Sequence, residues 1–302
     1  MIYHSPVLLQ ECIEGLNINP EGIYVDVTFG GGGHSKEILN HLTTGKLFSF
    51  DRDVDVLENL IEDNNFKLIQ TNYKNIKRFL RLEGVKKVDG VLADLGVSSH
   101  QFDVPERGFS FRFDSDLDMR MNVSSELTAK TVLNDYSEED LSNVFFNYGE
   151  IRQSRRVANL IVKHRQEQEI KTTSDLTSIL DGLVPEKRRN QFLSQVFQSI
   201  RIEVNDEIES LKIMLEDSVS LLNEGGRFVV MSYHSLEDRL VKNLFKRGGF
   251  SGEVEKDFFG NILKDLKEIN RKVIVSSLKE QKENNRSRSA KLRIAEKVNV
   301  ER

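Results

Sequence analysis

One stretch near the N-terminus, residues 23–34, restricts the possible folds of this chain most strongly. It reads Ile-Tyr-Val-Asp-Val-Thr-Phe-Gly-Gly-Gly-Gly-His, so strand-forming residues run directly into four consecutive glycines, and helical apolar spacing begins at Ser35. A glycine turn lets the backbone approach a ligand closely, and the N-terminus of a following helix offers unpaired N–H groups and the positive end of its dipole. The stretch predicts a strand, a turn and a helix that bind a nucleotide-like cofactor. The alternative is a strand-to-helix turn without a ligand.

Strand-like and helix-like segments alternate along the first third of the chain. Buried-type strands are predicted at residues 46–50, 66–70 and 88–94, with helical patterns at 35–42, 54–64 and 76–83. This rhythm indicates βαβ units, a parallel doubly wound sheet and a ligand site at the carboxyl ends of its strands. Three further strands are predicted at residues 225–234, 272–277 and 290–295, the last two as an antiparallel pair at the sheet edge. The predicted fold class is α/β, with a Rossmann-like, doubly wound, mostly parallel seven-stranded sheet.

The middle of the chain lacks strand signals. Between residues 96 and 224 the regular patterns are helical, at residues 138–148, 154–166, 173–183 and 187–200, after a loop rich in Phe, Arg and Asp. We therefore expect an all-helical domain at residues 105–205, inserted into a core formed by residues 1–104 and 206–302. In the second part of the core, residues 280–285 are polar, and we expect them to be mobile.

Composition narrows the class of protein further. Charged residues make up 30% and the hydrophobic set 38% of the 302 residues, and no apolar run reaches the length of a membrane span. Because the N-terminus also lacks the order of a signal peptide, we expect a cytoplasmic protein without a membrane partner. The single cysteine, Cys12, excludes an intramolecular disulfide and a multi-cysteine metal site, and we expect no metal. The net charge of −5 argues against indiscriminate nucleic-acid binding but allows local basic surfaces.

The glycine turn does not match the two common phosphate-binding patterns. A dinucleotide fingerprint needs a third glycine three positions after the second, and Ser35 or Lys36 stands there in either register. The Walker pattern fails because no Gly-Lys-Ser/Thr follows. An adenosine cofactor without a pyrophosphate fits better, and S-adenosylmethionine is the obvious candidate.

Two aspartates end predicted strands of the same sheet. Asp51 ends the second strand, where a carboxylate can accept hydrogen bonds from both ribose hydroxyls of such a cofactor. Asp94 ends the fourth strand, where a carboxylate can pair with the methionine ammonium group. The alternative for Asp51 is an ordinary turn residue, since aspartate is common in turns.

Several longer blocks carry a specific resemblance. They are Asp-Val-Thr-Phe-Gly-Gly-Gly-Gly-His-Ser at residues 26–35, Asp-Arg-Asp at 51–53, Asp-Leu-Gly-Val-Ser-Ser-His-Gln-Phe-Asp at 94–103, Glu-Arg-Gly-Phe-Ser-Phe at 106–111, Leu-Asp-Met-Arg-Met at 117–121 and Ser-Tyr-His-Ser-Leu-Glu-Asp-Arg at 232–239. With the terminal motifs His-x-Pro-Val-Leu-Leu and Arg-Ser-x-x-Leu-Arg-Ile-Ala-Glu, they span the whole chain. The sequence resembles the bacterial 16S ribosomal RNA cytosine-N4 methyltransferase family, known as RsmH or MraW.

The resemblance implies a class I methyltransferase core with an inserted helical domain for substrate recognition. It implies S-adenosylmethionine-dependent N4-methylation of one cytidine in the decoding region of 16S ribosomal RNA, in the small ribosomal subunit, and it leaves a homodimer open. The implied cofactor contacts are Gly32, Gly33, His34, Asp51, Tyr73, Asp94 and Gln101. The chain departs from the family at Gly31, where many members have Arg, at Tyr73, where many have Phe, and at His100, where Pro is common. An aromatic face against adenine survives the change at Tyr73, whereas His100 puts the loop before Gln101 in doubt.

The implied methyl acceptor, the exocyclic N4 amine of cytidine, is a poor nucleophile because its lone pair is delocalised into the ring. Hydrogen-bond acceptors and a fixed in-line approach to the methyl group would supply the acceleration, once the base is unstacked. Amino-methyltransferases acting on DNA have Ser/Asp-Pro-Pro-Tyr where this chain has Leu-Gly-Val-Ser-Ser at residues 95–99. Ser98 and Ser99 are therefore candidate catalytic acceptors, and Tyr233 or His234 is a candidate for positioning the base. His234 is an equally good candidate for a structural hydrogen-bonding residue at a strand end.

Two basic clusters are candidates for contacting RNA phosphates. Arg155 and Arg156 lie in the expected insertion, and Arg286, Arg288 and Lys291 lie near the C-terminus with few acidic neighbours. The alternative, which applies to the first cluster above all, is the solvated face of a helix.

Two other functions stay open on the sequence alone. An NAD-dependent oxidoreductase is disfavoured by the missing third glycine and by the Asp-Arg-Asp at the end of the second strand. A non-catalytic ribosome-assembly or RNA-binding factor would keep the cofactor pocket without transferring a methyl group.

Overall fold

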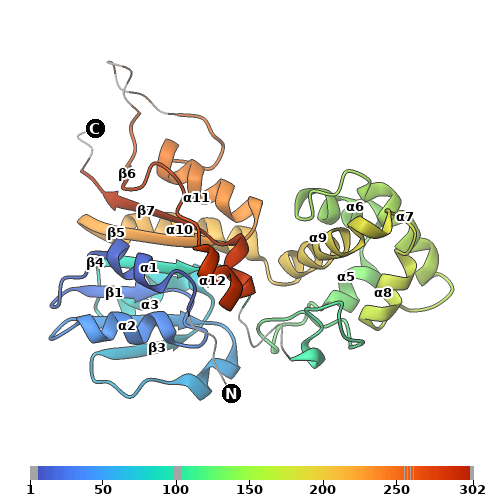
Figure 1. The fold of residues 1–302 in the computed structure, drawn as a ribbon, viewed down its shortest axis with the longest axis horizontal. Helices are drawn as coiled ribbons and strands as arrows, with labels where there is room; N and C mark the ends of the chain where they lie inside the picture. The colour runs from blue at the N-terminus through green and yellow to red at the C-terminus, as the bar shows by residue number, and fades with distance from the viewer. Residues whose placement is uncertain are drawn as a thin grey trace. The chain divides into compact units, whose positions relative to one another are not determined.

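The structure is a computed structural model (Figure 1), and it describes residues 6–97, 104–254, 256, 258, 260 and 262–299. Its contacts divide the chain into two compact units. The first contains Met1–Gly96 and Ile208–Arg302, and the second contains Val97–Glu207. The second unit thus starts before residue 105 and ends after residue 205, the bounds that the sequence suggested for the helical insertion.

The first unit is built on one seven-stranded sheet with the strand order β3-β2-β1-β4-β5-β7-β6. In chain order the strands are β1 (Ile23–Asp26), β2 (Lys46–Asp51), β3 (Phe66–Gln70), β4 (Val88–Asp94), β5 (Leu222–Ser232), β6 (Leu266–Glu268) and β7 (Lys291–Lys297). The first five strands run parallel, and β7 runs antiparallel to β5 and β6. The strand order reverses between β1 and β4, the switch point at which doubly wound sheets bind ligands. The predicted mostly parallel α/β sheet is confirmed.

The predicted pairing at the sheet edge is wrong in its first strand. Residues 272–277 form no strand, because Ile274 makes only an isolated bridge to Leu292 and Val275 is 57% exposed. The edge strand is β6, and β7 lies inside the sheet between β5 and β6. The β-branched run at residues 273–275 resembles a strand locally, but packing against neighbouring strands decides whether such a run becomes one.

Helices cover both faces of this sheet. They are α1 (Leu9–Leu16), α2 (Gly33–His41), η1 (Val54–Asn59), η2 (Tyr73–Asn75), α3 (Ile76–Leu82), α10 (Glu207–Leu221), α11 (Ser235–Arg247), α12 (Leu278–Glu283) and η4 (Asn285–Ser289), where η marks a 3-10 helix. Successive strand residues point to opposite faces. Val91 and Phe228 therefore belong to the core that includes α3, α10 and α11, whereas Leu92 and Val229 belong to the core that includes α1 and α2. Cys12 is buried in the second of these cores, in agreement with a packing role.

Two segments of the first unit, predicted as a helix at residues 54–64 and as a mobile polar stretch at residues 280–285, have a different local structure. The helix predicted over residues 54–64 is the shorter 3-10 helix η1, which ends at Asn59. Leu57 and Leu60 are 50% and 55% exposed, so no buried apolar face extends the helix further. The polar stretch 280–285 lies largely in α12 and η4, and α12 is capped by the Ser277 side chain, which accepts a hydrogen bond from the backbone N–H of Glu280.

The second unit is helical. Its elements are η3 (Pro105–Arg107), α5 (Ala129–Asp135), α6 (Glu138–Asn147), α7 (Ser154–Arg165), α8 (Thr173–Ile179) and α9 (Glu186–Val204), and the residues described there contain no strand. Helix α5, which the sequence did not predict, has seven residues and buries Ala129, Val132 and Leu133. The unit has its own hydrophobic core, and the buried side chains of Arg201 and Glu207 form a two-pronged ion pair with N···O distances of 2.9 Å.

Within the described ranges of the chain, no helix combines the length and apolar character that a membrane span requires.

Candidate functional site

The glycine turn between β1 and α2 has the backbone geometry that glycine allows. Gly30 and Gly32 have positive φ angles of 49° and 74°, a region that other residues rarely adopt. Gly33 begins α2, and a Cβ atom there would lie 2.2 Å from Cγ of Pro6. The Asn59 side chain donates a hydrogen bond to the carbonyl oxygen of Gly30 at 3.2 Å. Strained backbone angles and close packing by Pro6 therefore explain why at least three of the four glycines stand here.

Asp51 ends β2 beside this turn, and its carboxylate is held by backbone donors. One oxygen accepts the N–H of Gly30 and the other accepts the N–H of Asp53, both at 2.9 Å. Burial raises the pKa of Asp51 to about 6, against the lowering effect of these two hydrogen bonds. Both oxygens retain lone pairs, so this carboxylate can accept further hydrogen bonds from a ligand.

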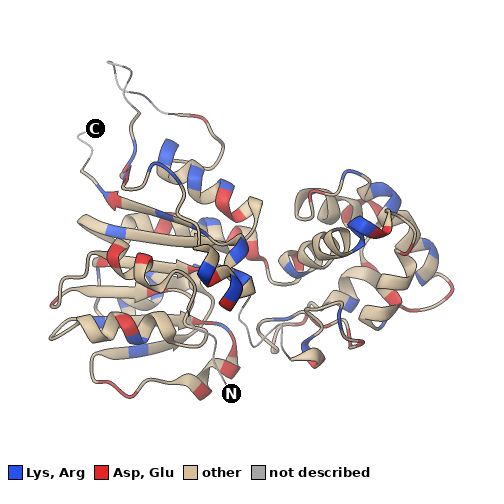
Figure 2. Cartoon of the chain, in the orientation of Figure 1, with Lys and Arg blue, Asp and Glu red and all other residues tan. Residues whose placement is uncertain are grey.

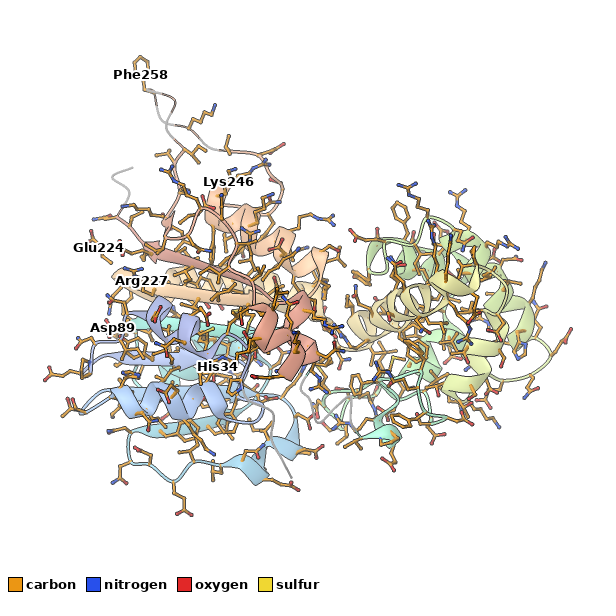
Figure 3. All side chains as sticks on the ribbon, viewed as in Figure 1. His34, Asp89, Glu224, Arg227, Lys246 and Phe258 are labelled. Atoms are coloured by element: carbon orange, nitrogen blue, oxygen red, sulfur yellow. The ribbon has the colours of Figure 1, made fainter. Side chains whose placement is uncertain are left out.

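Asp94 ends β4, and three elements position its carboxylate. The phenol O–H of Tyr233, directly after β5, donates to one oxygen at 2.7 Å. His34, in the first turn of α2 (Figure 3), places Nδ1 3.8 Å from the other oxygen. The backbone N–H of Asp94 donates to the Thr28 hydroxyl at 2.7 Å. Burial raises the pKa of Asp94 to about 6, and the His34 charge and the Tyr233 hydrogen bond act in the opposite direction.

A third carboxylate, Asp26 at the end of β1, lies behind the turn. It is 1% exposed and accepts hydrogen bonds from the backbone N–H and hydroxyl of Thr28 and from the Ser35 hydroxyl, which contacts the Ser49 hydroxyl at 2.8 Å. Burial raises the pKa of Asp26, and these donors partly offset the effect. Because its donors are all protein groups, Asp26 acts as a fixed support that links the turn to β2 and, through Thr28, to Asp94.

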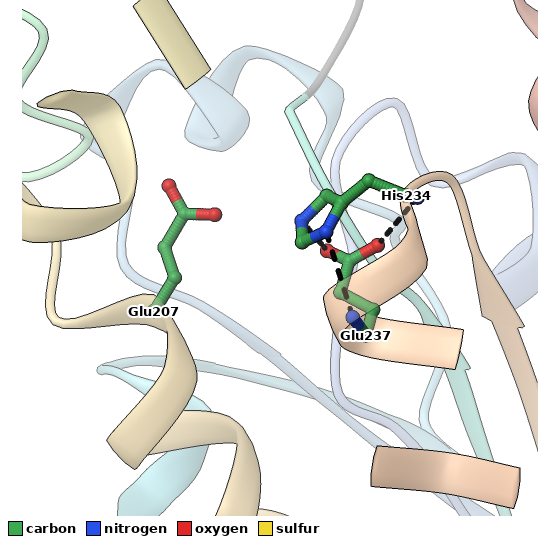
Figure 4. Close-up of side chains that lie close together, drawn as sticks. All are labelled: Glu207, His234 and Glu237. Carbon is green, nitrogen blue, oxygen red and sulfur yellow. Dashed lines mark hydrogen bonds and ion pairs between the residues drawn. The ribbon is translucent and has the colours of Figure 1, made fainter. Parts of the chain in front are cut away.

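His234 caps helix α11. Its Nδ1 atom accepts the backbone N–H of Glu237 at 3.5 Å, while Glu237 accepts the backbone N–H groups of Tyr233 and His234 at 2.9 and 3.3 Å. Figure 4 shows the two side chains against each other, with His234 Nε2 3.1 Å from a Glu237 oxygen. This reciprocal arrangement is a capping box, and it fixes the chain between β5 and α11. The geometry thus supports the structural interpretation of His234, and the same cap holds Tyr233 against Asp94.

The remaining predicted residues divide into described and undescribed positions. Tyr73 begins η2, half-buried against the sheet core. Ser98, Ser99 and Gln101 lie outside the described residues, as does His100. The structure therefore brings Asp51 to the glycine turn and His34 to Asp94.

Sequence reasoning missed two features of the site. The first is Tyr233 as the partner of Asp94, and the second is the contact of Pro6 with Gly33. No local signal announces either contact, because Tyr233 follows Asp94 by 139 residues.

The predicted basic residues are exposed to different extents. Arg155 and Arg156 are exposed on α7, and Arg288 is exposed on η4. Arg286 is half-buried. The Nζ atom of Lys291 lies 3.5 Å from a carboxylate oxygen of Asp238, and the other oxygen of Asp238 pairs with Arg293. Figure 2 shows Lys and Arg gathered on α12 and η4.

The strand order, the antiparallel β7 and the glycine turn with carboxylates at the ends of β2 and β4 together define a class I methyltransferase. A family model described as the MraW methylase family matches residues 1–298. The chain therefore belongs to the MraW methylase family.

Curated relatives resemble the chain over almost its full length. It is 58% identical to the Ribosomal RNA small subunit methyltransferase H of Flavobacterium johnsoniae, with 99% of each chain covered. It is 56% identical to the protein of the same name from Flavobacterium psychrophilum, with 96% of this chain and 100% of the relative covered. Among solved structures, an rRNA methylase from Streptococcus thermophilus aligns over 99% of both chains with 11% identity and a TM-score of 0.44, which is too low to support an argument.

Proposed function

We propose that the chain transfers the methyl group of S-adenosylmethionine to N4 of one cytidine in the decoding region of 16S ribosomal RNA, in the small ribosomal subunit. Family membership supports methyl transfer, and the names of the relatives support the ribosomal substrate. The observation that carries the cofactor assignment is the pair of half-buried carboxylates of Asp51 and Asp94, which lie at the ends of β2 and β4 on either side of β1 and whose pKa values burial raises. With a ribosomal substrate, the proposed reaction takes place in the cytoplasm.

The residues at the switch point fit an adenosyl amino acid. A raised pKa means that the ionised carboxylate is less stable in the folded protein than in water. The contribution of Asp51 and Asp94 to folding stability therefore falls as the pH rises from their ordinary pKa of 3.8 towards about 6. A ligand that supplies hydroxyl donors to Asp51 and a cation to Asp94 relieves this cost. Bound there, S-adenosylmethionine supplies an electrophilic methyl group on a positively charged sulfur.

The other cofactor contacts follow from the same placement. The first turn of α2, which begins at Gly33, offers backbone N–H donors to an anionic group. We propose that Tyr73 provides an aromatic face for adenine and that Gln101, outside the described residues, completes the adenine side of the pocket. Gly32 allows the positive φ angle of the turn, and Gly33 allows Pro6 to pack against the start of α2, so both shape the turn at which we propose that the cofactor binds.

The acceptor chemistry is assigned to the loop after β4. We propose that Ser98, Ser99 and nearby backbone carbonyls accept hydrogen bonds from the N4 amine, which localises its lone pair for attack. His234 is committed to capping α11, so we assign it the role of fixing Tyr233 and the start of that helix. The cytidine must leave its stack to reach the methyl group.

The basic residues provide the proposed RNA contacts. Arg155 and Arg156 on α7 and Arg288 on η4 are exposed and suit phosphate oxygens. Lys291 contributes less charge to such a surface because Asp238 partly neutralises it. The homodimer stays a prediction, which light scattering of the purified protein would test.

Mass-spectrometric mapping of ribosomal RNA from a deletion strain tests this function. One N4-methylcytidine should disappear from 16S ribosomal RNA, return with the wild-type chain and stay absent with Asp94→Ala. Asp181→Ala, which removes an exposed carboxylate from the second unit, should restore the mark and serves as the matched control. An unchanged methylation pattern in the deletion strain would exclude the proposal.

Two measurements separate the alternatives. Labelled S-adenosylmethionine incubated with small subunits and the purified chain should label the RNA, whereas a non-catalytic assembly factor would bind the cofactor and leave the RNA unlabelled. Calorimetry should show binding of S-adenosylmethionine, whereas an NAD-dependent oxidoreductase would bind NAD instead.

A further inference from the structure

The contacts of His34 define which of its nitrogens carries a proton. Nε2 lies 3.1 Å from the carbonyl oxygen of Val7, a group that can only accept a hydrogen bond. Nε2 is therefore the protonated nitrogen of the neutral ring, and Nδ1 points its lone pair at Asp94, with 3.8 Å between Nδ1 and the carboxylate oxygen. A lone pair facing a carboxylate is unfavourable, so a second proton at Nδ1 converts this contact into an ion pair.

His34 is the one positive group that the structure sets against Asp94 among the residues described. His34 is 6% exposed, and the Asp94 side chain is one quarter exposed, so water screens the pair only partly. The other titratable groups that act on Asp94 or share its surroundings carry negative charge when ionised. They are Asp26 from β1, Tyr233 from the end of β5, Glu237 from α11 and Cys12 from α1.

We propose that His34, anchored by the Val7 carbonyl oxygen, favours the ionised form of the Asp94 carboxylate and so prepares it for a cationic ligand group, and that arrival of this cation releases a proton at Asp94. His34 is thus a positioning residue that acts through Asp94. The inference rests on the proposed function, because the cation is the ammonium group of the methyl donor. It adds that binding of the ammonium group at Asp94 is linked to the release of a proton.

The direction of the linkage follows from electrostatics. An arriving ammonium group favours ionised Asp94, so binding expels a proton and tightens as the pH rises. With the pKa of Asp94 at about 6, about a tenth of the carboxylate is ionised at pH 5 and about nine tenths at pH 7. If the ammonium binds only the ionised form, this interaction strengthens about tenfold over that range.

Two ligands separate Asp94 from Asp51, whose pKa is also about 6. S-adenosylhomocysteine carries the ammonium group, whereas methylthioadenosine has the same adenine and ribose without it. The ratio of their affinities therefore cancels the ribose contribution of Asp51 and reports the amino-acid part of the ligand. The carboxylate of that part stays ionised between pH 5 and 7, so a change of the ratio with pH reports the ammonium group at Asp94. For the wild-type chain, we expect this ratio to rise about tenfold between pH 5 and 7. Calorimetry in buffers of different ionisation enthalpy should show more proton release near pH 6 with S-adenosylhomocysteine than with methylthioadenosine.

The variant His34→Gln isolates the role of the imidazole. Glutamine retains an N–H donor for the Val7 carbonyl oxygen but cannot carry a charge. Because the His34 charge lowers the pKa of Asp94, its loss should move the midpoint of the affinity ratio to higher pH and leave the methylthioadenosine curve unchanged. His41→Gln, on the exposed side of the same helix, should leave both curves as in the wild type.

Each outcome decides the inference. A midpoint that stays in place in His34→Gln, with affinity reduced equally at all pH values, would show a merely structural role and overturn it. Equal proton release by both ligands in the wild-type chain would overturn it without any variant. Failure of S-adenosylhomocysteine to bind at any pH would instead remove the proposed function itself.

Discussion

The substitution Gly33→Ala tests how the N-terminal segment supports the glycine turn. The new Cβ would lie 2.2 Å from Cγ and 3.2 Å from Cδ of Pro6. Since carbon atoms pack at about 3.5–4.0 Å, the Pro6 ring or the turn must move by about 1.3 Å or more. Overpacking of this kind costs about 1–3 kcal/mol, and the better helix propensity of alanine returns at most about 1 kcal/mol. We expect a net loss of about 1–2 kcal/mol of stability.

The displacement should also reach the ligand site. Pro6 precedes Val7, whose carbonyl oxygen holds His34, so movement of this segment disturbs the position of His34 beside Asp94. The assay combines thermal unfolding with calorimetric binding of S-adenosylhomocysteine, and both the melting temperature and the affinity should fall.

A double-mutant cycle makes this test specific. Pro6→Ala removes the ring atoms that the new Cβ would meet, so Gly33→Ala should cost much less in the Pro6→Ala background than in the wild type. Gly249→Ala is the matched control, because nothing lies within 4 Å of its added Cβ. The steric reasoning is refuted if Gly33→Ala is as mild as Gly249→Ala, or if Pro6→Ala gives no relief.

Three further predictions concern other parts of the molecule. Asp51→Asn should weaken S-adenosylhomocysteine binding by about 10- to 100-fold in calorimetry, because an amide cannot accept both backbone N–H groups and the ribose hydroxyls. The affinity of this variant should also depend less on pH around 6 than the affinity of the wild-type chain, because the titrating carboxylate is gone. Glu207→Ala should destabilise the second unit by about 3–5 kcal/mol in urea unfolding, because it removes the carboxylate that pairs with the buried Arg201 side chain. Asp181→Ala, at an exposed ion pair, should cost less than about 1 kcal/mol, and equal effects of the two variants would contradict the burial argument. Arg288→Glu should weaken binding to small-subunit RNA in filter-binding assays, and the slope of log K against log salt concentration should become shallower by about 0.7–0.9 for each lost phosphate contact. An unchanged slope would remove Arg288 from the proposed RNA surface.

Local sequence patterns predicted most of the sheet and the position of the site. The run from Ile23 into the glycines fixes a strand and a turn because strand formers and glycine have opposite backbone preferences. The alternation of such runs with helical spacing predicts a parallel sheet, and parallel strands place Asp51 and Asp94 at the same edge. The failed third glycine excluded a dinucleotide pattern without any structural information.

The same patterns failed where pairing partners lie far away in the chain. Residues 273–275 have strand composition but little burial, while β6 (Leu266–Glu268) has weak composition and becomes a strand because it pairs with β7. Strand formation at a sheet edge depends on the neighbouring strand more than on intrinsic preference. The short helices α5 and α12 were missed, whereas α3 and α8, which have seven residues each, were predicted because they lie within longer helical patterns at residues 76–83 and 173–183.

The sequence by itself determined the fold class, the family resemblance and the carboxylates of the proposed cofactor site, because each can be recognised from short local motifs. Tertiary structure alone decided how those carboxylates are charged and held. Tyr233 reaches Asp94 across 139 residues, and Glu280 accepts the backbone N–H of Leu8 across 272 residues. Burial, which raises the pKa values of Asp51 and Asp94, and the donors that oppose it exist only after the chain has folded.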